Sequence, residues 1–190
     1  MLPHAVQALP PGASVLDVGA GSGRDMAALQ ELGFNVFGVE PHAAMRETAL
    51  RLRPGLAGRL RDAALPALGR PFVDRQPQGF DALLCSAVLM HITPVELPTA
   101  LAALAQQLRP AAINDTEAQR PAMLLSLPEM DRQRLHGDRD ADNRRFHNHP
   151  PATVQALLAP LGLQLVSTCT QAQMRASTGN CWHTLLFRRG

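Results

Sequence analysis

The sequence predicts an α/β fold: a seven-stranded, mostly parallel sheet with helices on both faces and an antiparallel last strand. Three observations in its 190 residues support this class. Short β-rich segments alternate with longer helical patterns, the first strand enters a helix through a glycine-rich turn, and a polar stretch precedes the final strand. Strands that alternate with helices form parallel βαβ units, and right-handed crossovers place the helices on both faces of the sheet.

The alternation gives seven expected strands and four expected helices. Strands are expected at residues 14–18, 35–39, 58–61, 81–86, 123–127, 163–169 and 183–188. Helices are expected at residues 23–32, 43–52, 94–108 and 151–161. The stretch between the last two strands is polar and spans 11 residues (170–180), whereas a parallel crossover needs about a dozen or more. A long hairpin with an antiparallel final strand therefore fits better.

Composition and charge indicate one globular domain over residues 1–190, without an internal repeat or a linker. Hydrophobic residues make up 46% of the chain and charged residues 18%, which is typical of globular proteins. A net charge of +2 does not require a nucleic-acid or membrane partner. No apolar run reaches the roughly 18 residues of a membrane helix, and the N-terminus lacks the pattern of a signal peptide. We therefore expect a soluble, cytoplasmic protein, and the sequence leaves its oligomeric state open.

The three cysteines support a reducing compartment. Cys85, Cys169 and Cys181 are too few and too irregular for a disulfide framework. No pair has the CxxC spacing of a structural zinc site.

Residues 128–149 differ in composition from the rest of the chain. They hold 10 of the 34 charged residues, together with three histidines. The segment follows the fifth expected strand and should leave from its carboxyl end, the edge at which open α/β sheets bind ligands. We expect it to stay out of the core, and both a lid over the site and a disordered loop fit this composition.

The strongest local signal is a glycine-rich turn after the first expected strand. Apolar residues alternate up to Asp17, glycines follow at Gly19, Gly21 and Gly23, and good helix formers come next. Glycine lets the backbone approach a ligand closely, and the free N–H groups at the helix start favour an anionic or polar group. Dinucleotide-binding turns have the spacing G-x-G-x-x-G, whereas this turn has G-x-G-x-G. The spacing argues against a nicotinamide-dependent oxidoreductase.

An acid ends the second expected strand. Glu40 lies 21 residues after Gly19 (40 − 19), and a carboxylate at this strand tip can accept both hydroxyls of a ribose. It would also repel a 2′-phosphate, so the pattern favours a nucleoside with free hydroxyls. Because Pro41 follows, capping of the helix that starts near His42 is the alternative role of this carboxylate.

Taken together and in order, these motifs resemble those of the class I S-adenosylmethionine-dependent methyltransferases, over nearly the whole chain. VLDVGAGSGRD (15–25) resembles the first motif of that family, and VFGVEP (36–41) resembles its second-strand acid. RDAALP (61–66) resembles the turn that contacts adenine, and FDALLCSAVLMH (80–91) resembles the fourth-strand motif. The resemblance implies a Rossmann-like fold, S-adenosyl-L-methionine as cofactor and methyl transfer as the reaction.

The resemblance also implies a role for each matching position. The methionine end of the cofactor would lie against Asp17 and the glycine turn, Glu40 would hold the ribose, and Asp62 with the Ala63 N–H would contact adenine. The implied cofactor-binding residues are Asp17, Gly19, Ala20, Gly21, Gly23, Arg24, Glu40, Pro41, Asp62, Ala63, Cys85 and Ser86. Purely structural roles stay open for three of these residues. Asp17 would then hold the glycine turn through backbone N–H groups, Arg24 would lie on the helix surface, and Asp62 would be a solvated acid in a loop.

His91 is the expected catalytic base, because it follows the fourth strand at the ligand-binding edge. An oxygen or ammonium nucleophile must lose a proton, and a positioned base typically contributes about 10²–10⁴-fold. Packing between Met90 and the helix near Pro94 is the structural alternative. His147 and His149 lie two residues apart, but no third ligand is defined, so we expect no metal.

A small molecule is the expected methyl acceptor. Six Phe, one Trp and no Tyr provide few platforms for stacking nucleic-acid bases. The fourth strand also lacks the Asn/Asp-Pro-Pro-Tyr/Phe motif of amide- or base-nitrogen methylation. The acceptor atom stays open, and the alternative is a non-catalytic S-adenosylmethionine-binding or partner-interaction protein with the same fold.

Overall fold

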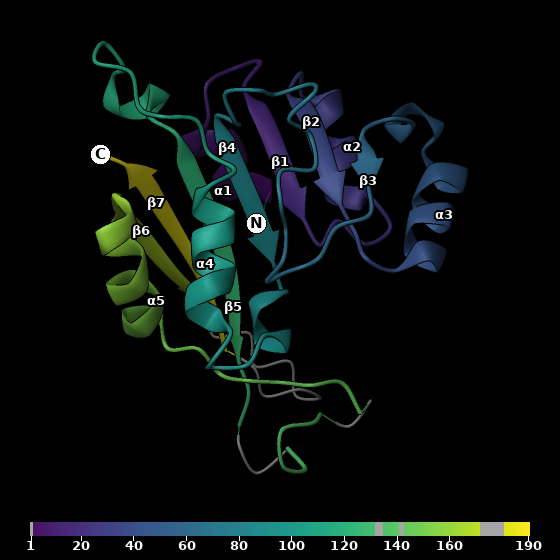
Figure 1. The fold of residues 1–190 in the computed structure, drawn as a ribbon, viewed down its shortest axis with the longest axis vertical. Helices are drawn as coiled ribbons and strands as arrows, with labels where there is room; N and C mark the ends of the chain where they lie inside the picture. The colour runs from purple at the N-terminus through teal and green to yellow at the C-terminus, as the bar shows by residue number, and fades with distance from the viewer. Residues whose placement is uncertain (1, 132–134, 141–142, 172–180) are drawn as a thin grey trace.

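The computed structural model describes residues 2–131, 135–140, 143–171 and 181–190, and for residue 171 its backbone only. Seven strands form one sheet in the order β3-β2-β1-β4-β5-β7-β6 (Figure 1). Their bounds are β1 (Ser14–Val18), β2 (Asn35–Val39), β3 (Leu60–Arg61), β4 (Ala82–Ser86), β5 (Ala122–Glu129), β6 (Leu163–Gln171) and β7 (Cys181–Arg189). The strands β1 to β5 pair in parallel, and β7 is antiparallel to both β5 and β6. The predicted fold class, including the final hairpin, is confirmed.

The described residues form five α-helices around the sheet. They are α1 (Leu2–Ala8), α2 (Arg24–Glu31), α3 (Ala43–Leu52), α4 (Leu97–Ala105) and α5 (Pro151–Leu158). The helix α4 begins three residues later than predicted, after a turn over residues 94–96. The Thr93 N–H donates to Glu96 Oε2 (3.1 Å) and the Glu96 N–H donates to Thr93 Oγ1 (3.3 Å), which is a capping-box arrangement.

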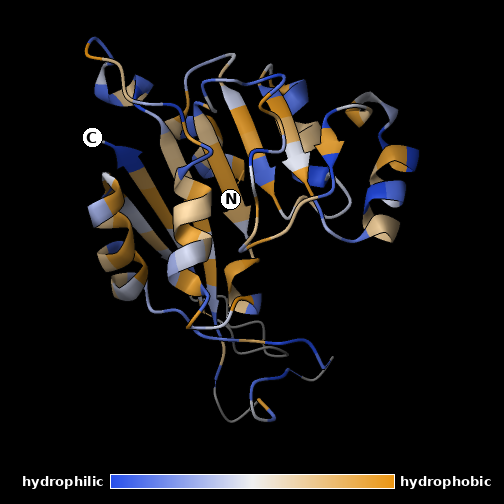
Figure 2. Ribbon diagram, viewed as in Figure 1, coloured by the Kyte–Doolittle hydropathy of each residue, from blue (hydrophilic) through white to orange (hydrophobic). Residues whose placement is uncertain are grey.

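Both faces of the sheet are buried. In Figure 1 the helices α4 and α5 lie in front of the sheet, and α1 and α2 lie behind it. Side chains alternate between the two cores along each strand, as the pleat requires: in β1, Leu16 and Val18 face the α4/α5 side, while Val15 faces the α1/α2 side. This double coverage explains why the parallel strands are nearly continuous apolar runs, which Figure 2 shows in orange.

The charged segment begins later than predicted. Pro128 and Glu129 belong to β5, which pairs with β7 up to Glu129↔Cys181. The segment then extends below the carboxyl ends of the strands in Figure 1. Its described part is not wholly outside the core, because Asp140, Phe146 and His149 are buried. The expectation that the segment stays out of the core is therefore wrong for these three residues.

Within the described ranges, the structure has no helix with the length and hydropathy of a membrane span.

Candidate functional site

The glycine-rich turn joins β1 to α2 and is held by the end of β2. The N–H groups of Gly19 and Ala20 both donate to the carbonyl oxygen of Val39, each at 2.9 Å. Gly19 has a φ of +77°, and a Cβ built on it would lie 2.3 Å from Cγ2 of Val88. The turn therefore crosses this edge of the sheet at a place where no side chain fits.

Glu40 connects the end of β2 to the same turn. The Gly21 N–H donates to Glu40 Oε2 (2.9 Å), and the His42 N–H donates to Glu40 Oε1 (2.9 Å). The parallel register, with Val18 opposite Val39, brings the two strand ends side by side. The structure thus places the carboxylate against the glycine turn, and its bond to His42, the N-cap residue of α3, shows that the helix-start role exists as well.

A cavity of about 270 Å³ opens at the carboxyl ends of β1 and β4. It is lined by Asp17, Gly19, Ala20, Gly21, Ser22, Arg24, Asp25, Ser86 and Ala87. Six of these residues belong to the predicted cofactor-binding set, whereas Ser22, Asp25 and Ala87 do not. Ser22 and Asp25 lie within the glycine motif itself, so the motif already contained the signal that could have found them.

Ala87 carries no sequence signal for its place in the cavity wall. Its φ is +57°, a left-handed conformation that is uncommon for a residue with a Cβ. Its N–H donates to the carbonyl oxygen of Ser126 at 3.2 Å, which ties the turn after β4 to β5. The strained residue therefore aims the backbone of this turn along the cavity wall.

Acidic side chains dominate the electrostatics of the cavity. Asp17 is only 5% exposed, and no described residue donates a hydrogen bond to its carboxylate. Burial, with smaller contributions from Asp25 and Glu40, raises the pKa of Asp17 to about 7. Arg24 opposes this shift, but its exposed guanidinium is paired with Asp25 at 2.9 Å. The arrangement favours a ligand that carries positive charge and N–H donors.

Several predicted residues lie outside the cavity wall. The Cys85 thiol is fully buried in the core, and this burial raises its pKa. Its main chain pairs with Val18 on one side and Leu125 on the other. Gly23 has a φ of +74° and starts α2, and a Cβ on it would lie 2.4 Å from Cδ1 of Leu56. These two residues shape the walls from behind and do not line them.

The predicted adenine contacts lie beyond the tip of β2. The side chain of Asp62 is exposed, Ala63 is half-buried and Pro41 is exposed. Arg46 of α3 connects this group to the site, because its Nη1 donates to the carbonyl oxygens of Glu40 and Pro41 at 2.7 Å each and its Nη2 donates to Asp62 (3.2 Å). Sequence reasoning missed Arg46, which looks like one more surface charge on an amphipathic helix.

The predicted base is positioned by the charged segment. His91 ends the short helix η2 (Leu89–His91), and its Nδ1 lies 2.7 Å from the carbonyl oxygen of Arg145. Since a carbonyl oxygen only accepts, Nδ1 donates, and the neutral ring keeps its lone pair on Nε2. The His147 N–H also donates to the carbonyl oxygen of Met90 at 2.7 Å. The charged segment is thus attached to the turn after β4.

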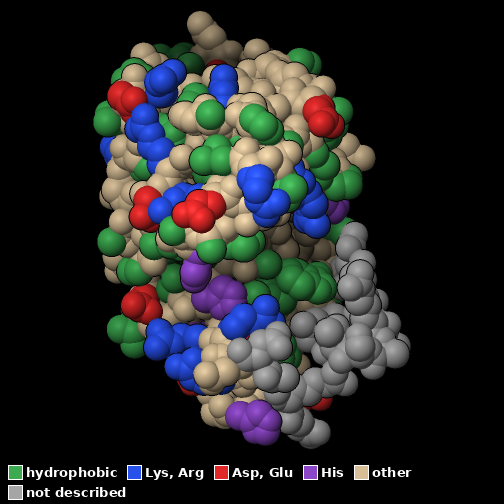
Figure 3. Space-filling model, turned by 90° about the vertical axis from the view of Figure 1, so that its right-hand side faces the viewer, with side chains coloured by type: hydrophobic (Ala, Val, Ile, Leu, Met, Phe, Trp, Pro, Cys, Tyr) green, Lys and Arg blue, Asp and Glu red, His purple; other side chains and the backbone are tan. Residues whose placement is uncertain are grey.

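His149 has a different function from His91. Its Nε2 lies 2.9 Å from the carbonyl oxygen of Leu89 and 3.0 Å from that of Ile92, and burial lowers its pKa. A neutral ring that donates from Nε2 to these carbonyls anchors the segment and offers no base there. Figure 3, which views the right-hand side of Figure 1, shows histidine side chains near the middle of that face, with arginine side chains above and below them. Among the described residues, no three potential metal ligands come together.

Residues 15–111, about half of the chain, match the model of a methyltransferase domain family. The chain belongs to this methyltransferase family. The predicted class I S-adenosylmethionine-dependent methyltransferase family is confirmed, and with it the predicted cofactor.

Individual relatives agree with this identification. A segment of 82 residues is 46% identical to a protein-L-isoaspartate O-methyltransferase of Methylorubrum populi, and it covers 42% of this chain and 36% of that relative. The chain thus matches only about a third of the length of this relative.

Solved structures share the fold. A magnesium protoporphyrin IX methyltransferase of Synechocystis PCC 6803, with bound S-adenosylhomocysteine, aligns with a TM-score of 0.69 and 19% identity, over 95% of this chain and 75% of that chain. A 1,6-didemethyltoxoflavin-N1-methyltransferase of Burkholderia thailandensis aligns with a TM-score of 0.68 and 24% identity, over 98% of this chain and 74% of that chain. At these identities the alignments establish the fold of the methyltransferase and leave its acceptor open.

Replacing Asp17 by Asn should change how the stability of this methyltransferase depends on pH. The unfolded chain releases the Asp17 proton near pH 3.8 and the folded chain near pH 7. Between these values the folded state binds more protons, so this residue lowers the free energy of unfolding as pH rises, by at most about 1.4 kcal/mol per pH unit. Urea denaturation from pH 4.5 to 7.5 should show this component in the wild type and not in Asp17→Asn. The exposed control Asp62→Asn should retain it, and coinciding slopes for the wild type and Asp17→Asn would contradict the assignment.

Proposed function

We propose that this methyltransferase transfers the methyl group of S-adenosylmethionine to a small-molecule acceptor, with the cofactor held between the glycine turn and the turn after β4. The observation that carries the proposal is the junction of β1 and β2, where Gly21 donates to Glu40 beside a cavity that contains the buried Asp17. Fold and family give the reaction class. The residues at this junction support the binding mode.

The residues fit the cofactor in charge and shape. S-adenosylmethionine carries a sulfonium and an ammonium group, and Asp17 offers a buried carboxylate that lacks a donor among the described residues. The glycine turn leaves room beside that carboxylate, and Ser86 faces the cavity from β4. In this proposal Glu40 holds the ribose, and Asp62 with the Ala63 N–H contacts adenine. When bound, the cofactor supplies an electrophilic methyl group, and the protein supplies its orientation.

The acidic cavity also distinguishes the cofactor from its product. Loss of the methyl group removes the sulfonium charge, so a site with Asp17, Asp25 and Glu40 stabilises the charged cofactor more than S-adenosylhomocysteine. Burial strengthens the effect because the surroundings of Asp17 have a low dielectric constant. The difference in affinity favours exchange of product for fresh cofactor.

His91 is the proposed base. Its Nδ1 donates to the Arg145 carbonyl, so in the neutral ring Nε2 carries the lone pair. In this role Nε2 accepts the proton that the acceptor atom loses as it attacks. Arg145 acts through its main-chain carbonyl and is therefore a positioning residue. It is also one of the residues that attach the segment to the turn after β4.

A small molecule suits the acceptor side of the site best. The solved relative from Burkholderia thailandensis binds 1,6-didemethyltoxoflavin, which shows that this fold takes a small heterocyclic acceptor. The curated relative is named for a protein substrate, but the match to it covers 36% of its length. Few aromatic residues are present to stack nucleic-acid bases. A protein acceptor, which the name of the curated relative suggests, is the second candidate.

Glu40→Ala should weaken binding of S-adenosylhomocysteine at least about tenfold, because it removes the carboxylate that holds the glycine turn and would hold the ribose. A tenfold loss corresponds to about 1.4 kcal/mol, within the range of one charge-assisted hydrogen bond. Isothermal titration calorimetry measures the change. Glu47→Ala on the exposed side of α3 is the matched control and should bind like the wild type. Equal affinity of Glu40→Ala and the wild type would remove Glu40 from the cofactor site.

His91→Gln should lower the turnover rate about 10²–10⁴-fold while leaving the affinity for S-adenosylhomocysteine unchanged. Transfer of a labelled methyl group into a metabolite library identifies the acceptor first, and the variant is then compared at saturating cofactor. His136→Gln, in the charged segment that contacts His91, should keep the wild-type rate. A full rate in His91→Gln would exclude the base role. Label that enters protein and no metabolite would replace the small-molecule acceptor by a protein acceptor.

A further inference from the structure

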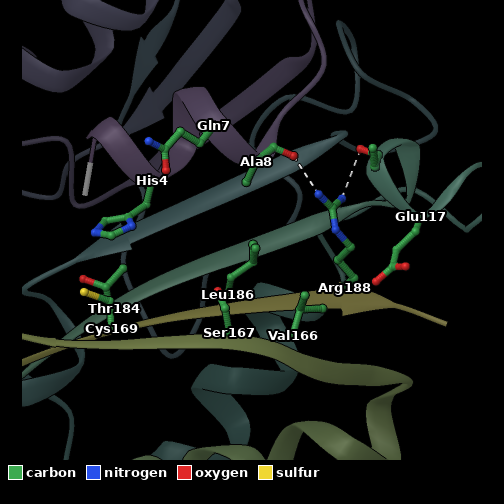
Figure 4. A pocket seen from close by; sticks show the side chains of 11 residues that line it. His4, Gln7, Ala8, Glu117, Val166, Ser167, Cys169, Thr184, Leu186 and Arg188 are labelled. Carbon is green, nitrogen blue, oxygen red and sulfur yellow. Dashed lines mark hydrogen bonds between the residues drawn. The ribbon is translucent and has the colours of Figure 1, made fainter.

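A second cavity lies away from the cofactor site, between α1 and the β6–β7 hairpin (Figure 4). Its volume is about 460 Å³, and a neighbouring cavity of about 180 Å³ shares Glu117, Val166 and Arg188 with it. We call the two together the hairpin groove. None of the residues that line the hairpin groove also lines the cofactor cavity.

Part of the hairpin groove is apolar. Leu186 of β7 and Val166 of β6 form its floor, and Ala8 lies at the end of α1. Figure 4 shows His4 of α1 above Thr184 and the strands, so the helix covers the floor without filling the space. A half-covered apolar floor with a few polar groups around it is the usual construction of a small-ligand pocket.

One end of the hairpin groove contains a buried arginine. Arg188 is only 8% exposed, and its three hydrogen bonds go to the neutral carbonyl oxygens of Ala8 (2.6 Å), Ala118 (3.1 Å) and Arg120 (2.8 Å). No salt bridge joins Arg188 to a described carboxylate, and burial lowers its pKa. A buried cation whose hydrogen-bond partners are all neutral has lost its hydration, and Glu117 provides a counter-charge without a salt bridge.

A second arginine lies at the same end, because Arg120 lines the small cavity together with Arg188. Arg189 also belongs to this wall, but its side chain points to the opposite face of the sheet, where its Nη2 donates to the carbonyl oxygen of Ala105 (2.6 Å). Among the described residues, the exposed Glu117 is the one acidic side chain in the wall, and it raises the pKa of Arg188 without forming a salt bridge with it. The local charge at this end is therefore positive.

We propose that the hairpin groove binds an amphipathic organic anion, with its carboxylate or phosphate at Arg120 and Arg188 and its apolar body on Leu186 and Val166. Guanidinium groups bind such anions through charge-assisted hydrogen bonds, and the buried guanidinium of Arg188 has only neutral hydrogen-bond acceptors among the described residues. The anion would supply a counter-charge in direct contact with Arg188, and the floor would take the apolar body. The proposal does not depend on the methyl acceptor or on the cofactor site.

Octanoate and octanol test the charge requirement, because they share a chain length and differ in charge. Calorimetry and thermal unfolding of the full chain should show that octanoate binds and stabilises at least about tenfold more strongly than octanol. Arg120→Gln should weaken octanoate binding at least about threefold, and Glu117→Gln should strengthen it. Equal binding of the two probes, or weaker binding in Glu117→Gln, would overturn the proposal.

A blocking variant tests the place of binding without touching the arginines. Ser167 lines the groove, whereas the exposed neighbour Thr168 lines neither cavity. Ser167→Trp should reduce octanoate affinity at least about tenfold, and Thr168→Trp should leave it unchanged. Both variants should bind S-adenosylhomocysteine like the wild type, which reports that they are folded. Full octanoate affinity in a folded Ser167→Trp would place the anion elsewhere and overturn the proposal.

Discussion

The arrangement at the proposed cofactor site depends on three N–H groups of the glycine turn and the two acceptors that receive them. Gly19 and Ala20 donate to the Val39 carbonyl, and Gly21 donates to the Glu40 carboxylate. These bonds exist because β1 and β2 are parallel and end at the same edge. They hold the turn across the strand tips, so that Asp17 faces a cavity instead of the core. A side chain on Gly19 would meet Val88, so glycine is required where the turn meets the fourth strand.

The same geometry creates an electrostatic cost. Asp17 and Asp25 line a small cavity, Glu40 lies beside it, and the guanidinium of Arg24, which also lines it, is paired with Asp25 and largely exposed. A buried carboxylate near other carboxylates destabilises its own charged form, and this is the origin of the raised pKa of Asp17. A cationic ligand relieves the cost. The protein without a ligand is thus less stable than it would be with neutral residues around this cavity. A cationic ligand recovers this free energy when it binds.

The sequence predicted the elements whose signals are local. The strands β1 and β2 and the helix α3 lie at the expected residues, since apolar runs and helical periodicity define them. The glycine motif located five residues of the cavity wall because its spacing reflects one compact turn, and the fourth-strand motif located a sixth, Ser86. Arg46 and Ala87 could not be found in this way, because the role of the first depends on the approach of β3 to α3 and that of the second on a backbone angle.

Tertiary packing also decided the surface features. The burial of His149 follows from its hydrogen bonds to the turn after β4, more than fifty residues earlier in the chain, and composition suggested the opposite. The hairpin groove depends on how far α1 extends over β6 and β7, which no pattern in either segment encodes. Hydrophobic periodicity thus predicted the strands and helices, and it did not predict the cavities between them.

Arg188 connects parts of the chain that the ribosome synthesises at different times. Arg188 lies in β7. It donates hydrogen bonds to the carbonyl oxygen of Ala8 at the end of α1, 180 residues earlier, and to that of Ala118 in the short helix before β5. α1 therefore lacks this hydrogen bond until β7 has joined the sheet. During translation α1 cannot form this bond until β7, about 180 residues later in the chain, has been synthesised, so α1 and β7 complete their packing in the same late step.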